Sequence, residues 1–246
     1  MDYKNSVNLL EFIHFQKRIL RKYKNYIQKQ MQTNYKKAAL LVYWLNDYID
    51  YIKSEENFNP KQNIKYIRGQ IVLVNFGFRI GKELGGLHYA IVLDVHNANY
   101  ESTLTVIPLK SNKNRQTRYH KIYTVILSSS IKTSLYDKGT SIINSNFQRL
   151  LEISRKMSEA ISPNELNQLK SDADKIKRRT RLAQKILVFS DKLNNGSIAD
   201  IGQITTISKQ RIVQPCKKDD ILFGVIANAE DMSLIERKIK YLYFST

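Results

Sequence analysis

A series of short β-branched segments constrains the fold of this 246-residue chain more than any other feature. Apolar runs rich in Val, Ile and Leu occupy residues 70–76, 89–93, 103–109 and 121–127, and a last run spans 197–207. Runs of this length and spacing are typical of a small β-barrel or a curled sheet. The strand-like part of the chain therefore predicts a compact β domain.

Helical periodicity precedes this β domain and interrupts it. In residues 1–60, apolar side chains recur every three or four positions, which predicts two helices that form an N-terminal hairpin. Residues 146–195 show the same periodicity and predict a second helical hairpin. Its second helix should begin at a capping box, Ser162 with Glu165, where Pro163 takes the first helical position.

The expected chain is therefore α+β and has three parts. The first is the N-terminal hairpin of residues 1–60, and the second is a β domain built from residues 66–145 and 196–246. The third is the hairpin of residues 146–195, inserted into the β domain. A C-terminal helix should follow the last strands.

The charge of the chain favours a polyanionic partner. Forty Lys and Arg residues against 22 Asp and Glu residues give a formal net charge of +18. Such a field attracts nucleic acid or an acidic protein, and charge alone leaves both open. The same ambiguity holds for the basic cluster of Lys175, Lys177, Arg178, Arg179 and Arg181, which is either a plain solvated face or a patch that contacts phosphates.

Other features of the sequence suggest the compartment and the absence of cofactors. Cys216 is the only cysteine, so no disulfide can form within the chain, which fits the reducing cytoplasm. We see no signal peptide and no apolar run near the roughly 20 residues that cross a bilayer, so no membrane partner is expected. No Cys-x-x-Cys or His-x-x-x-His spacing occurs, so we expect neither a metal nor a cofactor.

Four segments, in this order, resemble the motifs of the MazF/PemK toxins of type II toxin-antitoxin systems. They are the opening Arg-Gly motif, the glycine-rich loop with the second strand, the Pro-x-Thr region and the late Lys-Gln-Arg turn, at residues 67–72, 81–93, 106–111 and 203–212. The resemblance covers residues 66–145 and 196–246. It implies an SH3-like small β-barrel, as in MazF, PemK and CcdB, that forms a homodimer. It also implies metal-independent, sequence-selective cleavage of single-stranded RNA, and neutralisation by an acidic antitoxin protein.

The chain departs from the family pattern at two functional positions. The family's Arg-Pro-Ala strand start is replaced by His88, Tyr89 and Ala90, and the threonine of its Pro-x-Thr motif is replaced by Lys110, followed by Ser111. Two other functions therefore remain open. One is a catalytically inactive module that binds nucleic acid or the antitoxin. The other, ranked last, is a gyrase-directed toxin of the CcdB type, whose C-terminal tryptophan segment is missing here because the only tryptophan is Trp44.

These positions suggest a set of catalytic residues. Histidine is the side chain that ordinarily titrates near neutrality, so a histidine at position 88 is a candidate to exchange protons with RNA directly. Lys110 would supply positive charge, and the Ser111 hydroxyl a hydrogen bond to a phosphate oxygen. Glu83 would either orient His88 or act as the base, although it can also simply pair with Lys82 or Arg79.

Further basic residues are candidates for RNA binding. The opening motif makes Arg68 a candidate phosphate contact, and Arg79 and Lys82 belong to the glycine-rich segment. The segment after Lys110 interleaves positive charges with Tyr119, as a groove for single-stranded RNA requires, although a solvated loop is the alternative reading. Its candidate contacts are Lys113, Arg115 and Arg118. His14, His96 and His120 have no motif partners and are interpreted as surface or structural residues.

Overall fold

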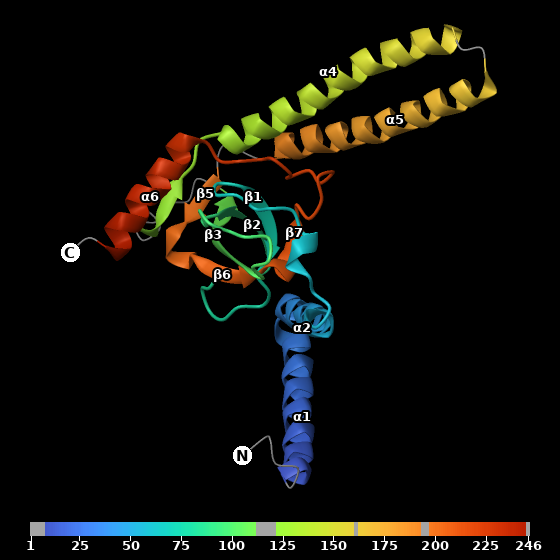
Figure 1. Cartoon of the computed structure of the whole chain (residues 1–246). Coiled ribbons are helices and arrows are strands. Elements are labelled where there is room, and N and C mark those ends of the chain that lie inside the picture. The colour runs from blue at the N-terminus through green and yellow to red at the C-terminus, as the bar shows by residue number, and fades with distance from the viewer. Residues whose placement is uncertain (1–7, 112–121, 160–161, 193–196, 245–246) are drawn as a thin grey trace. The chain divides into compact units, whose positions relative to one another are not determined.

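The computed structural model describes residues 8–111, 122–159, 162–192 and 197–244. The chain divides into two compact units, residues 1–57 and 58–246. The described residues hold five α-helices and seven strands (Figure 1). The expected α+β class is therefore confirmed.

The first unit consists of two helices, α1 (Leu9–Thr33) and α2 (Tyr35–Glu55). Asn34 separates them, and its side chain caps α2 by accepting a hydrogen bond from the backbone N–H of Lys37 at 3.1 Å. In Figure 1, α1 is seen lengthwise and α2 nearly end-on. No residue of α1 is buried, and Ala38 is the buried residue of α2. This unit therefore has little apolar core of its own.

The second unit is built on one antiparallel sheet. Its strand order is β4-β5-β3-β2-β1-β7, and β6 also pairs with β3. The strands are β1 (Ile71–Asn75), β2 (Leu87–Val92), β3 (Thr103–Ser111), β4 (Thr124–Ile126), β5 (Ser197–Asp200), β6 (Thr205–Ser208) and β7 (Ile212–Gln214). All seven overlap the expected β domain, residues 66–145 and 196–246.

The sheet that the described strands form is open, so the expected small β-barrel is not closed. Its two edges are β4 and β7. The reason lies in the length of β3, which pairs with β6 over residues 103–106 and with β5 over residues 109–111. A single 3-10 turn, η3 (Ile201–Gln203), connects β5 to β6. Two consecutive strands thus pair along one long neighbour, and the described residues show no strand that joins β4 to β7.

Side chains of the sheet alternate between two apolar clusters. In β1, Ile71 belongs to a large cluster on one face, whereas Val72 and Val74 belong to a smaller cluster on the other. Because both faces are covered, the strands are continuous apolar runs and lack the alternation of a half-exposed sheet. The large cluster also takes in helix residues such as Leu135 and Ile186.

Those residues anchor the inserted hairpin, which consists of α4 (Ser130–Glu159) and α5 (Pro163–Lys192). The helix α4 begins at Ser130, well before the expected start near residue 146. Gly139 does not break it, because this glycine permits close packing: a Cβ there would lie 2.7 Å from Cδ2 of Leu187. The capping box at the start of α5 is confirmed, since Ser162 and Glu165 each donate a backbone N–H to the other's side chain at 3.2 Å.

The C-terminal helix α6 (Ala229–Tyr243) is joined to the start of α4 by a buried carboxylate. Asp231 accepts hydrogen bonds from the backbone N–H and the hydroxyl of Ser128, both at 2.8 Å, and from the Ser130 hydroxyl at 2.6 Å. Three donors satisfy this carboxylate, which fixes both helices on the large apolar cluster. Among helices of the described residues, none combines the length and apolar character that a membrane crossing requires.

Candidate active site

The glycine-rich loop between β1 and β2 is closed at its neck by backbone hydrogen bonds. Phe76 N–H donates to the carbonyl of Gly86 at 2.8 Å, and Gly86 N–H donates to that of Gly77 at 2.7 Å. Gly77 and Gly86 have φ of 74° and 85°, which glycine adopts without strain. At Gly85, a Cβ would lie only 2.6 Å from the Gly77 oxygen. The neck of the loop therefore depends on glycine for both conformation and space.

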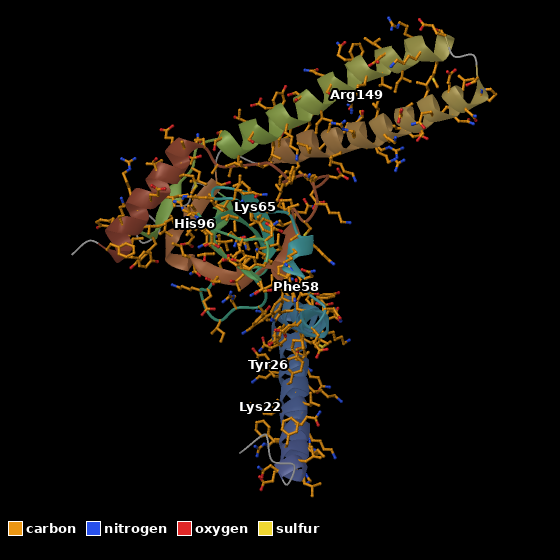
Figure 2. All side chains as sticks on the ribbon, viewed as in Figure 1. Lys22, Tyr26, Phe58, Lys65, His96 and Arg149 are labelled. Carbon is orange, nitrogen blue, oxygen red and sulfur yellow. The ribbon has the colours of Figure 1, made fainter. Side chains whose placement is uncertain are left out.

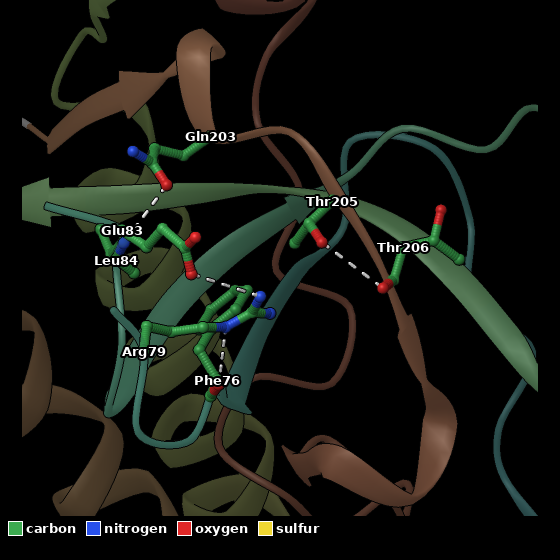
Figure 3. A network of polar contacts seen from close by, with 7 residues as sticks. All are labelled: Phe76, Arg79, Glu83, Leu84, Gln203, Thr205 and Thr206. Atoms are coloured by element: carbon green, nitrogen blue, oxygen red, sulfur yellow. Dashed lines mark hydrogen bonds and ion pairs between the residues drawn. The ribbon is translucent and has the colours of Figure 1, made fainter. Parts of the chain in front are cut away.

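Two contacts hold the loop against the rest of the sheet. Leu84 is buried in the smaller apolar cluster, and its N–H donates to Oε1 of Gln203 in η3 at 3.2 Å (Figure 3). Inside the loop, Nε of Arg79 donates to the Phe76 carbonyl at 3.1 Å, and its guanidinium lies 4.0 Å from Glu83 (Figure 3). The loop is thus tied to the segment that connects β5 to β6.

His88 lies in β2, one residue beyond the loop. It pairs with Val74 of β1, which in turn pairs with Ile212 of β7. By the alternation of the strand, His88 is on the same face as Ala90, which belongs to the smaller apolar cluster. Its side chain is partly exposed, and it makes no hydrogen bond in the described part of the chain. An imidazole at the edge of an apolar cluster is accessible to a ligand.

Lys110 lies near the end of β3 and forms an ion pair with Asp200 of β5. The Asp200 side chain is only 7% exposed, whereas that of Lys110 is 33% exposed. The pairing of β2 with β3 runs from Val92 with Val106 to Ala90 with Pro108. Continued two residues past the pair of Ala90 with Pro108, this register would place His88 opposite Lys110, on the same face of the sheet. By this continuation of the register, the two departures from the family motif form one row across β2 and β3.

Ser111 and Glu83, the other two candidate catalytic residues, make no recorded contact with His88. Ser111 is exposed at the end of β3 and pairs with Ser197. The Glu83 side chain is 55% exposed and its recorded partner is Arg79, so the expected contact of Glu83 with His88 is not formed in this structure. Lys82 is exposed on the same loop.

Arg68 lies at the opposite end of β1 from the loop. Its guanidinium donates to the carbonyl of Leu93 and to Glu236 of α6, the latter at 2.7 Å. These contacts tie the start of β1 to α6, so the structure does not bring Arg68 together with His88. Lys113, Arg115 and Arg118 lie outside the described residues.

The late Lys-Gln-Arg turn also makes backbone contacts. It forms the 3-10 helix η4 (Lys209–Arg211). Nζ of Lys209 donates to the Ala98 carbonyl at 3.1 Å, and Nε of Arg211 donates to that of Asn75 at 2.9 Å. Burial lowers the pKa of the Lys209 ammonium. This motif therefore holds neighbouring segments of the sheet in place.

Sequence reasoning missed Asp200 and Gln203 as parts of the site. Gln203 is the first residue of the motif at residues 203–212, so this motif could have marked it as a site residue. Asp200 carried no signal, because its partner Lys110 is distant in sequence. Within the described residues, no group of three or more His, Cys, Asp and Glu side chains could hold a metal ion.

Comparison with known proteins finds one similarity, which covers part of the chain. Residues 67–176 match the model of the PemK-like, MazF-like toxins of type II toxin-antitoxin systems. The match runs from the residue before Arg68 into α5, and so includes part of the inserted hairpin. Among curated proteins, none matches the chain significantly. The strands β1 to β4, with His88 and Lys110, all lie within the residues that are similar to the PemK-like, MazF-like toxins.

Proposed function

We propose that this domain is the toxin of a type II toxin-antitoxin system and acts as a metal-independent, sequence-selective endoribonuclease on single-stranded RNA. The proposal is supported by the recorded register of β2 with β3, which would place His88 opposite Lys110 when it is continued by two residues, in a segment similar to the toxin family. An imidazole and an ammonium group in one row provide a proton acceptor and a positive charge. Internal attack on an RNA phosphate requires both.

The proposed reaction begins at the ribose 2′-hydroxyl. His88 accepts the 2′-hydroxyl proton while the 2′-oxygen forms a bond to phosphorus. The bond from phosphorus to the 5′-oxygen then breaks, and this oxygen takes a proton from the Lys110 ammonium or from water. The products are a 2′,3′-cyclic phosphate and a free 5′-hydroxyl, so atoms and charges balance without an external nucleophile.

Lys110 can take part while it is paired with Asp200. An ammonium group has three N–H donors, and the ion pair with one carboxylate leaves donors for a phosphate oxygen. The exposed Ser111 hydroxyl beside it supplies a neutral donor. Both groups then stabilise the charge that develops on the phosphorane.

The loop between β1 and β2 is proposed to contact RNA on either side of the cleaved bond. Lys82 is exposed there, and the exposed pair of Arg79 with Glu83 contributes little to stability at 4.0 Å. RNA phosphates can therefore replace Glu83 as the partner of Arg79, which frees Glu83 to orient His88 or act as a base. Arg68, Lys113, Arg115 and Arg118 remain proposed phosphate contacts.

The family implies further properties that are part of this proposal. They are a cytoplasmic homodimer, an SH3-like ancestry of the open sheet, and an antitoxin whose acidic segment covers the RNA site. The net charge of +18 supports an acidic partner as well as RNA.

One observation favours a second candidate, a catalytically inactive module that binds nucleic acid or the antitoxin. The buried Asp200 carboxylate already neutralises Lys110, where the family pattern carries a threonine. If this pairing removes Lys110 from the reaction, the domain would bind RNA without cleaving it. Cleavage and binding therefore have to be measured separately.

The test incubates the purified full-length chain with unstructured RNA in EDTA. We expect cleavage that leaves 2′,3′-cyclic phosphate ends, and resistance of a substrate with 2′-deoxyribose at the cleaved position. His88→Ala should abolish cleavage with an almost unchanged melting temperature, whereas the control His96→Ala should cleave normally, because His96 is exposed after β2. Full activity of His88→Ala would remove this residue from the mechanism, and a need for added Mg²⁺ would refute internal attack.

A further inference from the structure

The inserted hairpin carries a hollow of about 420 Å³ between α4 and α5. Both helices supply its walls, and Ile153, Leu169 and Ile176 form an apolar part of its lining. Figure 2 shows Arg149 about midway along the hairpin. Volumes near 300 Å³ and above are typical of sites for small ligands. This hollow is separate from the row of His88 and Lys110.

Four cationic side chains line this hollow, and two of them are already neutralised. Lys156 of α4 lies 2.6 Å from Glu152, and Lys175 of α5 lies 2.7 Å from Asp172. In each case the hydrogen bond from the lysine lowers the pKa of the carboxylic acid, so both carboxylates stay ionised. The lysines therefore contribute little net charge to the hollow.

The two arginines give the hollow its net positive charge, although Arg149 is close enough to Glu152 to help lower the pKa of that carboxyl group. Arg149 of α4 and Arg179 of α5 both line the hollow, and in the described residues neither forms an ion pair within 4.0 Å. Two guanidinium groups from facing helices suit an anion with several oxygens, because each presents a planar fork of donors. The hollow therefore has the charge and the donor groups that a phosphate site requires.

We propose that Arg149 and Arg179 bind the phosphate backbone of the RNA at a distance from the cleavage site. This proposal rests on the proposed function and adds a second contact region to it. The distance follows from helix geometry: Arg149 lies 14 residues beyond the buried Leu135, or about 21 Å along α4. Leu135 belongs to the large apolar cluster and His88 lies on the face of the smaller one, so an RNA that contacts both His88 and the hollow must extend well beyond the cleaved bond.

The structure also selects among the basic residues of α5. Of the cluster from Lys175 to Arg181, only Lys175 and Arg179 line the hollow, and Lys175 is paired. Arg178 belongs to the same cluster but does not line it, and on α4 Arg155 is exposed and lies 3.9 Å from Glu159. Arg155 and Arg178 are therefore matched controls from the same two helices.

The binding experiment uses fluorescence anisotropy with a labelled 20-nucleotide RNA and the full-length chain in the His88→Ala background, so that bound RNA is not cut. Arg149→Ala with Arg179→Ala should weaken binding about tenfold, as expected for lost hydrogen bonds to charged groups. The slope of log binding constant against log salt concentration should become shallower by roughly 1.4, or about 0.7 for each lost phosphate contact. The control, Arg155→Ala with Arg178→Ala, removes the same charge and should change affinity less than twofold.

Comparing the two double variants distinguishes a specific phosphate site from general electrostatic attraction by the basic hairpin. Equal losses in both would overturn the proposal, because general charge would then explain binding. An unchanged affinity in the Arg149 and Arg179 variant would overturn it as well. Competition by inorganic phosphate or a mononucleotide as effective as competition by the unlabelled RNA would assign the hollow to a free small anion instead.

Cleavage measured with the His88-containing chain provides the second readout. With a long RNA, the Arg149 and Arg179 variant should raise KM and leave kcat unchanged, and with a four-nucleotide substrate it should match the unmodified chain. An equal loss on the short substrate would show that the arginines act through the fold, which refutes a remote contact. Failure of the unmodified chain to cleave any RNA would refute the proposed function, while the binding result would still decide on the hollow.

Discussion

The ion pair between Lys110 and Asp200 should give an asymmetric response to substitution. Asp200 is only 7% exposed, so Lys110→Met leaves a buried carboxylate without its partner. Removing one partner of a fully buried pair costs about 3–5 kcal/mol. Lys110 is 33% exposed, so solvent screens this pair partly, and we expect a cost of about 2 kcal/mol.

The opposite substitution should cost less. In Asp200→Asn the Lys110 ammonium can turn toward solvent, so we expect a loss of about 1 kcal/mol. The double variant, Lys110→Met with Asp200→Asn, no longer contains a buried charge. It should therefore be more stable than the sum of the two single effects by about 1 kcal/mol, the coupling typical of residues in direct contact.

Urea unfolding of the four proteins measures this cycle. The midpoint should shift while the slope with denaturant stays constant, because the exposed surface on unfolding is unchanged. Strict additivity of the two substitutions, or a Lys110→Met variant as stable as the unmodified chain, would show that the pair does not form in solution. The argument that Asp200 positions Lys110 would then be wrong.

Three further outcomes follow from the site. Gly85→Ala should destabilise the chain by about 1–3 kcal/mol and reduce RNA cleavage, because its Cβ would lie 2.6 Å from the Gly77 oxygen; a wild-type melting temperature would contradict this. Asp200→Asn should lower kcat for RNA cleavage and leave KM nearly unchanged if the pair positions Lys110; unaltered kcat would speak for the inactive binding module. Burial raises the pKa of the Cys216 thiol, so native Cys216 should react slowly with iodoacetamide at pH 8. Because the thiol has a higher pKa in the folded chain than in the unfolded chain, the unfolded chain releases the proton more readily as pH rises. The folded chain should therefore lose stability above about pH 8.5, and Cys216→Ala should remove that loss in denaturant titrations.

The sequence contained the local signals of this fold but not the pairing of distant segments. Ser162 and Glu165 predicted the start of α5, because a capping box is formed by residues only three positions apart. The start of α4 at Ser130 was missed, because Gly139 reads as a helix breaker until its contact with Leu187 of the other helix is known. A glycine that permits close packing cannot be told from a glycine that ends a helix by sequence alone.

The open sheet in place of the expected small barrel has a related reason. Strand-like segments are visible in one sequence, but their partners are not, and here β5 and β6 share the same neighbour, β3.

The candidate site was likewise only partly predictable from the sequence. His88 and Lys110 were found from the motif, whereas the role of Asp200 depends on a contact across 90 residues of sequence. Arg68 was assigned to RNA, yet its guanidinium contacts Leu93 and Glu236.

Asp200 also changes how the replacement of the family's threonine by Lys110 is interpreted. A lysine at a strand end has many side-chain conformations, and ordering it on RNA would cost entropy. The pair with a buried carboxylate restricts those conformations before RNA arrives, so the ammonium can be held in place in advance. The carboxylate also reduces the charge that the phosphate experiences, so the two effects oppose each other. Which effect is larger decides between an active enzyme and a binding module.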